Sequence, residues 1–486
     1  MKNVDISKAL FNCAGILSLF LVGVVFGVAH TAPREALLFI GDSVASVYQE
    51  RHTLTGVRPE RFLQPARYDG EGVTVNEVPG GDADLVLLSG FFDGGNELRL
   101  IRRDGGIVAR WPVRFSELFP DTGHLDQPPA TDWNVDTHGA LIEPDGSVVF
   151  NFEYAGLVKL DRCGRVAWTL PRITHHSVEF AATGGFWVPG RRIHQEGAAS
   201  PFPPFQTPFS EDTLLQVSAE GEVLRELSLL QIMYDNGLEG LLTASGHSIY
   251  KSMSWDREIV HLNKIAELPA EIADDFPMFE AGDLAVSIRQ LNLVMVIDPD
   301  DGKVKWWRIG PWLRQHDPEF RAGGRLVVFN NNAYKTAYPV GDEKTPVEFE
   351  RGSTVVEIDP ASGAYATLYG QMAGQEMLTI VRGKVELTPL GGLLVTEFEG
   401  GRVFESDAAG RVIWEYINRY DSEAVAEITE ARLYPQNYFT VSSWSCDEAR
   451  QMTDIGGSFA ADFRNRAGYS GLSDHPPVSA MLAPGS

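Results

Sequence analysis

Cysteine is scarce in this sequence. Only three occur among 486 residues, namely Cys13, Cys163 and Cys446. None of them belongs to the short, repeated Cys or His spacings that bind metals. The sequence therefore predicts no metal site. Whether Cys163 and Cys446 pair in a disulfide stays open at this point.

Basic side chains are also in short supply. The chain carries 41 Lys and Arg against 66 Asp and Glu, a formal net charge of −25. Because binding to a phosphate backbone needs a basic surface, this balance argues against nucleic acid as a partner. An anionic substrate would need a local cluster of His and Arg.

The one long uncharged apolar run lies near the N-terminus, from Ala9 to Ala29. As a helix it would span about 30 Å, one hydrocarbon thickness. Lys2 and Lys8 favour a cytoplasmic N-terminus over residues 1–8. We interpret residues 9–29 as a transmembrane anchor, with a cleaved signal peptide as the alternative. Either interpretation places the rest of the chain on the exported, periplasmic side.

Helical periodicity is scarce beyond this run, and a β-hairpin phrase recurs instead. The phrase is an apolar strand, an Asp or Ser, a Gly turn, then Val and often Trp. It occurs at residues 98–111, 157–168, 214–227, 293–307, 354–368 and 401–416. The expected turn glycines are Gly106, Gly164, Gly221, Gly302, Gly363 and Gly410. Each segment is interpreted as two period-2 strands joined by a tight turn.

Six similar hairpins, each too small for a core of its own, predict radial repetition. The expected fold is all-β, a six-bladed β-propeller over residues 76–447, preceded by the single transmembrane helix. Residues 30–75 are assigned to a stalk or packing segment. Residues 448–486, rich in Gly, Ser, Pro and Ala, are assigned to a partly disordered tail. Two β-sandwiches, the alternative, would not explain the shared phrase.

A second phrase, a histidine followed eight residues later by a glycine, precedes several hairpins. It pairs His138 with Gly146, His176 with Gly184 and His316 with Gly324, and His261 begins a related version with an insertion. Equivalent positions of a propeller lie at equivalent radii and heights. These histidines are therefore expected to converge at one end of the axis. The alternative is that His merely suits a recurrent turn.

Arg289 interrupts an otherwise apolar segment, residues 284–293, and is expected inside a strand. A buried Arg needs a partner or an anionic ligand. Asp283 and Asp298 are the candidate partners. Together with the histidines, Arg289 would otherwise form a compact anion site.

These residues lie in segments that resemble the bacterial arylsulfate sulfotransferases. The segments are "HHSVEF" (175–180), "WDREIVHLNKI" (255–265), "GDLAVSIRQLN" (282–292), "QHDPEFRAGGRLVVFNNN" (315–332) and "GKVELTPLGGLLVTEFEGGRVFESDAAGRVIWEY" (383–416). They follow the order of the family. The resemblance implies a six-bladed propeller that moves a sulfuryl group from an aryl sulfate to a phenol without a nucleotide cofactor.

The resemblance also implies roles. His316, in the Gln-His motif, would be the nucleophile that is transiently sulfated. His261 and Asn263, with Arg289, would hold the sulfuryl oxygens. His176 would occupy the proton-transfer position, with His175 as the alternative from the same pair. His138 has no family role and is expected to line the channel beside the substrate.

Two positions depart from the family pattern. Its usual Asp after the His pair is Ser177 here, and its usual Ser after His-x-Asn is Lys264. Two functions therefore stay open: a membrane-anchored sulfotransferase with an aryl sulfate donor and a phenolic acceptor, and an inactive propeller that acts as a binding module. A quinone-dependent dehydrogenase is disfavoured, because no tryptophan-docking repeat or calcium-binding carboxylate cluster is recognisable.

Overall fold

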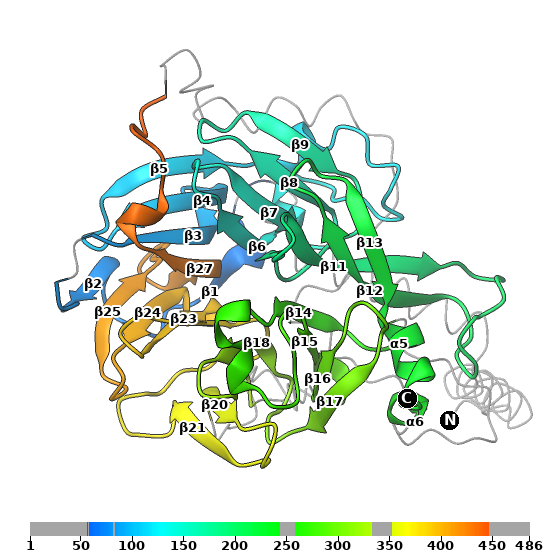
Figure 1. Cartoon of the computed structure of the whole chain (residues 1–486). Helices are drawn as coiled ribbons and strands as arrows, with labels where there is room; N and C mark the ends of the chain where they lie inside the picture. Colours follow the sequence, from blue (N-terminus) through cyan, green and yellow to red (C-terminus); the bar gives the residue numbers. More distant parts are fainter. Residues whose placement is uncertain (1–55, 57, 81–82, 244–257, 333–351, 447–486) are drawn as a thin grey trace, which may run out of the picture. The chain divides into compact units, whose positions relative to one another are not determined.

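Six sheets of four or five antiparallel strands form a ring within residues 62–455 in the computed structural model (Figure 1). The structure describes residues 56, 58–80, 83–243, 258–332 and 352–446. The expected six-bladed, all-β propeller is confirmed.

Each blade is an antiparallel meander, and the first and sixth blades also contain one strand from the opposite end of the described chain. The first blade orders β27 (Ile428–Tyr434), β3 (Leu85–Phe92), β4 (Gly95–Arg102) and β5 (Ile107–Pro112). The second orders β6 (Thr137–Ile142), β7 (Val148–Phe152), β8 (Gly156–Leu160) and β9 (Val166–Leu170). The third orders β10 (Glu179–Phe180), β11 (Phe186–His194), β12 (Phe209–Val217) and β13 (Val223–Ser228).

The other three blades follow the same plan. The fourth orders β14 (Leu262–Glu267), β15 (Leu284–Ile288), β16 (Leu293–Ile297) and β17 (Val304–Ile309). The fifth orders β18 (His316–Arg321), β19 (Arg325–Asn330), β20 (Thr354–Ile358) and β21 (Tyr365–Tyr369). The sixth orders β22 (Lys384–Leu387), β23 (Leu393–Glu397), β24 (Arg402–Ser406), β25 (Val412–Ile417) and β2 (Gly72–Asn76). First strands of neighbouring blades touch, as in β10–β14, β14–β18, β18–β22, β22–β27 and β27–β6, so these strands lie innermost.

The recurrent hairpin phrase forms the two outer strands of each blade's meander. Five of the six expected turn glycines adopt positive φ, between 72° at Gly302 and 87° at Gly221. In the first hairpin Gly105 takes this role instead (φ 87°), while the Gly106 N–H bonds to Asp104 Oδ1. The recurrent Trp fastens one blade to the turn of the next. Trp111 donates to the Asp161 carbonyl, Trp168 to Ala219, and Trp414 to Arg103, which joins the last blade to the first.

The second strands of the blades, such as β7, are largely apolar on both faces because each blade packs between two others. All five residues of β7 are buried. Val148, Phe150 and Phe152 join the core shared with the first blade, and Val149 joins the core shared with the third. This two-sided burial explains the continuous apolar runs in the sequence.

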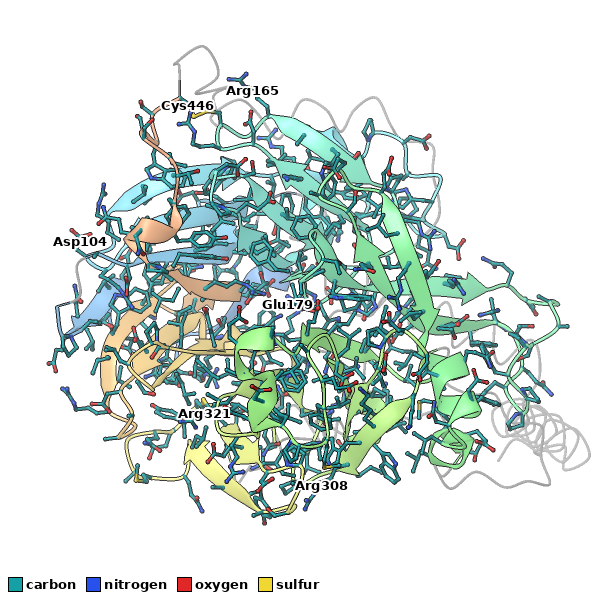
Figure 2. The ribbon with its side chains drawn as sticks, in the orientation of Figure 1. Asp104, Arg165, Glu179, Arg308, Arg321 and Cys446 are labelled. Carbon is teal, nitrogen blue, oxygen red and sulfur yellow. A yellow bond between two sulfur atoms is a disulfide. The ribbon has the colours of Figure 1, made fainter. Side chains whose placement is uncertain are left out.

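Segments from both ends of the described chain complete the ring. β27 supplies the innermost strand of the first blade, and β2 adds an outer strand to the sixth. β1 (Leu63–Pro65) pairs with β26 (Ala424–Ala426). A disulfide joins Cys163 to Cys446, with Cα atoms 5.7 Å apart, which answers the question that the sequence left open. Figure 2 places Cys446 at the outer edge and Glu179 near the centre.

Helices are few and short among the described residues. They are α4 (Phe115–Leu118), α5 (Leu229–Asp235), α6 (Glu239–Thr243) and the 3₁₀ turns η1 (Glu60–Phe62), η2 (Asp132–Asn134), η3 (Ala270–Asp275), η4 (Arg289–Leu291), η5 (Phe398–Gly400) and η6 (Gln436–Tyr438). Within this part of the chain, none is long and apolar enough to cross a membrane. The anchor expected at residues 9–29, the N-terminal segment 1–8 and the tail 448–486 lie outside the described residues.

Candidate functional site

The four repeat-equivalent histidines meet at the start of the innermost strands of four successive blades. His138 is the second residue of β6, and His316 is the first residue of β18. His176 and His261 lie just before β10 and β14. The His176 ring is 4.3 Å from His138, 4.8 Å from His261 and 6.0 Å from His316, measured between centroids. The predicted convergence is thus observed.

The backbone is adapted to aim two of these rings inward. His176 and His261 have φ values of 57° and 65°. Such left-handed conformations are uncommon for non-glycine residues and concentrate at functional sites, where the surrounding structure must hold them. Their Nε2 atoms lie 3.2 Å apart.

A buried hydrogen-bond network fixes the tautomer of His316. Its Nδ1 lies 2.7 Å from Asn331 Oδ1 and 3.1 Å from the Arg314 carbonyl. Asn331 donates its amide hydrogens to the carbonyls of Thr379 and Arg382, so its oxygen must face the histidine. Both neighbours of Nδ1 are acceptors, and Nδ1 therefore carries the proton. Nε2 is left as a lone pair, buried and without a hydrogen-bond partner among the described residues.

Gln315 and Asn263 hold the His316 segment in place. The Gln315 amide donates to Ser287 Oγ and to the carbonyls of Ile288 and Leu293 on the fourth blade. Asn263 donates to the Gln315 carbonyl at 2.7 Å. One amide hydrogen of Asn263 is thereby used for positioning.

Arg289 lies beside this cluster, but not inside a strand as expected. It begins the 3₁₀ turn η4, directly after β15. The interruption of the apolar segment marks the end of β15, where the chain turns. Its ion partner is Glu258, with Nη2 3.6 Å from Oε2, and neither Asp283 nor Asp298. The buried Nε of Arg289 makes no hydrogen bond among the described residues.

The site keeps its imidazoles neutral. Burial first, and the Arg289 charge second, hold the pKa of His316 well below its ordinary value. The same two causes lower the pKa of His261 to about 4, although Glu258 opposes them. Burial and the neighbouring histidines lower the pKa of His176, and burial with the Arg382 charge lowers that of His138.

Several residues of this site were not identified from the sequence. Glu258 Oε2 lies 2.6 Å from His261 Nδ1. Asp212 Oδ1 lies 3.6 Å from His175 Nε2 and accepts from Arg191 Nε at 2.9 Å. Glu258 and Asn331 fall inside the family-like segments at 255–265 and 315–332, which could have drawn attention to them. No sequence pattern marks Asp212 or Arg191.

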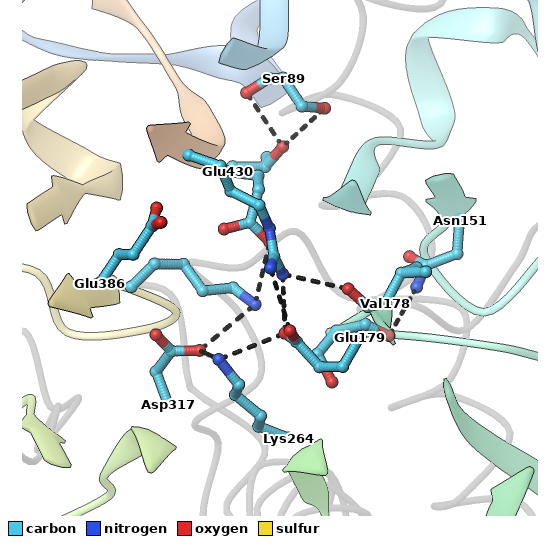
Figure 3. Close-up of polar contacts among 12 residues, drawn as sticks. Ser89, Asn151, Val178, Glu179, Lys264, Asp317, Glu386 and Glu430 are labelled. Atoms are coloured by element: carbon cyan, nitrogen blue, oxygen red, sulfur yellow. Dashed lines mark hydrogen bonds and ion pairs between the residues drawn. The ribbon is translucent and has the colours of Figure 1, made fainter. Parts of the chain in front are cut away.

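The two departures from the family pattern join contacts between blades. Ile265 donates its N–H to Ser177 Oγ at 3.4 Å. Lys264 Nζ lies 3.2 Å from Glu179 and 3.1 Å from Asp317 (Figure 3). It also pairs with Glu319. Burial lowers the pKa of Lys264, but the three carboxylates outweigh it and raise this pKa well above its ordinary value.

This ionic network links the innermost strands of five blades. Its members are Glu179, Lys264, Asp317, Glu319, Lys384, Glu430 and Arg432. Lys384 lies 3.6 Å from Asp317 and 3.3 Å from Glu430. Lys264 is therefore paired within this network and lies outside the histidine cluster.

Comparisons with known proteins identify a family for this sequence. The model of the family described as arylsulfotransferase (ASST) matches residues 140–419, more than half of the chain. No curated protein matches the sequence. Two solved structures illustrate the fold likeness: a protein of unknown function from Bacteroides caccae (15% identity, 69% of this chain and 93% of that chain, TM-score 0.41) and the β-propeller domain of Myceliophteria thermophila Cps50 (Swd1) (8% identity, 74% and 90%, TM-score 0.36). At these TM-scores the likenesses carry no argument about function.

Proposed function

The chain belongs to the arylsulfotransferase family, and on that premise we propose that it transfers a sulfuryl group from an aryl sulfate to a phenol through a sulfo-histidine at His316. The observation that carries this proposal is the His316–Asn331 pair. It leaves Nε2 as a buried, unprotonated and unoccupied lone pair. A neutral imidazole of this kind can attack sulfur and divide one difficult displacement into two easier ones.

In the first half-reaction an N–S bond forms at His316 Nε2, and the S–O bond to the aryl oxygen breaks. The phenolate leaves and takes up a proton. In the second half-reaction the acceptor phenol loses its proton, its oxygen attacks sulfur, and the N–S bond breaks with its electron pair returning to Nε2. No nucleotide or metal is consumed in this scheme.

Charge on the sulfuryl oxygens needs donors that are in place before the reaction. Arg289 supplies a guanidinium whose buried Nε has no hydrogen-bond partner among the described residues. Asn263 retains one amide hydrogen beyond the one given to Gln315. His138 accepts the His176 N–H at Nδ1, so its proton sits on Nε2, ready to donate to a substrate oxygen. His261, beside Arg289, and His176 would complete the charge and proton handling.

The compartment is part of the same proposal. Disulfides persist in oxidising compartments, and Cys163 and Cys446 form one here. With the apolar run at residues 9–29, this supports a propeller held on the exported side of a membrane.

The test is an assay with a chromogenic aryl sulfate, with and without added phenol. We expect release of the chromophore and sulfation of the phenol, both abolished in His316→Ala. His124→Ala is the matched control, because His124 bonds to the Ala155 carbonyl, outside the cluster. Binding of the aryl sulfate without any transfer would instead identify the inactive binding module.

A further inference from the structure

Six side chains form a closed ring beside His316. They are His261, His176, His175, Asp212, Arg191 and Glu258. Arg191 joins the two carboxylates, with Nε 2.9 Å from Asp212 and Nη2 against Glu258. The three histidines complete the ring from the other side. His175, Asp212 and His176 are almost fully buried, so this part of the ring is shielded from solvent.

The three imidazoles make four polar contacts in series. Glu258 is 2.6 Å from His261 Nδ1, and the Nε2 atoms of His261 and His176 are 3.2 Å apart. The Nδ1 atoms of His176 and His175 are 2.8 Å apart, and His175 Nε2 is 3.6 Å from Asp212. Each contact holds one proton when it is a hydrogen bond. Three neutral imidazoles carry one ring N–H proton each. With four contacts and three protons, one contact must lack a proton unless the three histidines take up a fourth proton.

The geometry shows which contact lacks the proton. The carboxylate of Glu258 requires the proton of His261 on Nδ1. His261 Nε2 then accepts from His176 Nε2, and His176 Nδ1 accepts from His175 Nδ1. His175 Nε2 is left bare toward Asp212. At 3.6 Å this is the longest of the four contacts, which measure 2.6, 3.2 and 2.8 Å elsewhere.

We propose that His175, held between Asp212 and His176, is the proton store of the transfer reaction and exchanges protons with the substrate oxygen through His176. The inference rests on the proposed sulfuryl transfer. In the loaded state the three histidines hold four protons, and the fourth lies on His175 Nε2, facing Asp212. When the aryl oxygen leaves, it takes the proton from His176 Nε2, and His175 passes its Nδ1 proton to His176 Nδ1. His175 keeps its Nε2 proton, and all three imidazoles are then neutral.

The acceptor half-reaction reverses these steps. The phenol gives its proton to His176 Nε2, and His176 returns its Nδ1 proton to His175. In the cycle the three histidines thus alternate between the loaded state, in which all four contacts hold a proton, and the unloaded state, in which the His176–His261 contact lacks one. Proton number and charge balance over one cycle, and no other reagent is needed.

The charges around the chain favour loading when the donor binds. Asp212, Glu258 and Arg191 together carry one net negative charge, which Arg289 neutralises in the free site. A bound sulfate ester, itself an anion, engages Arg289 and leaves the ring one positive charge short. Tyr154 covers His175 at a centroid distance of 4.9 Å, and its burial raises its pKa far above 10, so it stays neutral. His138 and His316 are neutral for the reasons given above. A proton on His175 restores the balance.

Leaving-group dependence tests this inference. A phenolate from a phenol with a pKa near 10 needs a proton as it leaves, whereas a nitrophenolate leaves well without one. In His175→Gln, transfer from phenyl sulfate should slow on the order of 100-fold or more, and transfer from nitrophenyl sulfate by less than about tenfold. The control is His194→Gln, because His194 also pairs with a carboxylate, 2.6 Å from Glu211, but does not belong to the ring of six side chains. The rate of transfer from either donor should be unchanged in this control.

An equal decrease in the rate of transfer from both donors in His175→Gln would contradict the role of His175 as a proton store. Absence of transfer by the unmodified protein would instead overturn the proposed function. Should the variant fail to fold, calorimetry of the unmodified protein decides the matter. Inorganic sulfate binding near neutral pH, measured in buffers of different ionisation enthalpy, should take up a proton from the buffer. A binding heat independent of the buffer would contradict the inference.

Discussion

His316 Nδ1 lies 2.7 Å from Asn331 Oδ1, and this contact decides which nitrogen of the histidine can react. The two residues end up side by side because β18 and β19 are adjacent antiparallel strands, His316 begins the first and Asn331 follows the second. The amide of Asn331 is itself oriented by two backbone carbonyls. A short segment of chain therefore contains both the nucleophile and the group that prepares it.

Asn331→Ala tests this preparation. Without the amide oxygen, only the Arg314 carbonyl, at 3.1 Å, favours the Nδ1 proton. The other tautomer then becomes populated, and formation of the sulfo-enzyme should slow by about 10- to 100-fold, the range known for groups that orient metal-binding histidines. Rapid mixing with donor alone measures this step. An unchanged rate would show that the tautomer is set by something else.

Gly139→Ala should displace His176 while leaving the His176 side chain itself unaltered. A Cβ at this position would lie 2.3 Å from the His176 carbonyl oxygen and 2.6 Å from the Val178 nitrogen, both backbone atoms. A shift of about 1 Å in a catalytic group can cost on the order of 100-fold in rate. The turnover number should fall by this order while circular dichroism stays the same. Gly95→Ala, at the start of β4 and with no atom within 4 Å of the added Cβ, is the control and should be active.

Lys264→Met should destabilise the propeller. It removes the cation that lies between Glu179, Asp317 and Glu319. Breaking such a buried set leaves uncompensated charge and costs about 3–5 kcal/mol of unfolding free energy. Arg411→Met, which removes a largely exposed pair with Glu77, should cost less than about 1 kcal/mol. Chemical denaturation compares the two. Equal losses would contradict the structural role of Lys264.

Glu386 should make the protein less stable as pH rises. Burial raises the pKa of this carboxyl from 4.5 to about 8. Between these values the folded state keeps a proton that the unfolded state has lost, so the unfolding free energy falls with increasing pH. Glu386→Gln can still accept the Leu433 N–H and should flatten this slope. Denaturation at a series of pH values measures it, and an identical slope in wild type and variant would count against the raised pKa.

The sequence was sufficient to predict the propeller and the meeting of its histidines. Both depend on repetition, because local hairpin patterns define the blades, and equivalent positions in a closed ring must converge. The Trp of the repeated phrase was visible, although its role in joining neighbouring blades required the structure.

Residues that act through long-range partners could not be predicted in this way. Asp212 and Arg191 lie in β12 and β11, and nothing in those strands indicates that His175 lies next to Asp212. Arg289 was identified, but its partner Glu258 lies 31 positions away along the chain and on no shared strand. The roles of His138, His175, His176, His261, Asn263, Arg289 and His316 in catalysis stay predictions that the geometry supports.

The most direct test of the central claim is intact-mass spectrometry of the protein after mixing with aryl sulfate donor and no acceptor, followed by peptide mapping. We expect one sulfuryl group per chain, located on the peptide that contains His316, and its loss on addition of phenol. His316→Ala should show no label under any condition. A sulfated peptide that excludes His316, or a His316→Ala variant that still transfers sulfate near the wild-type rate, would contradict the account.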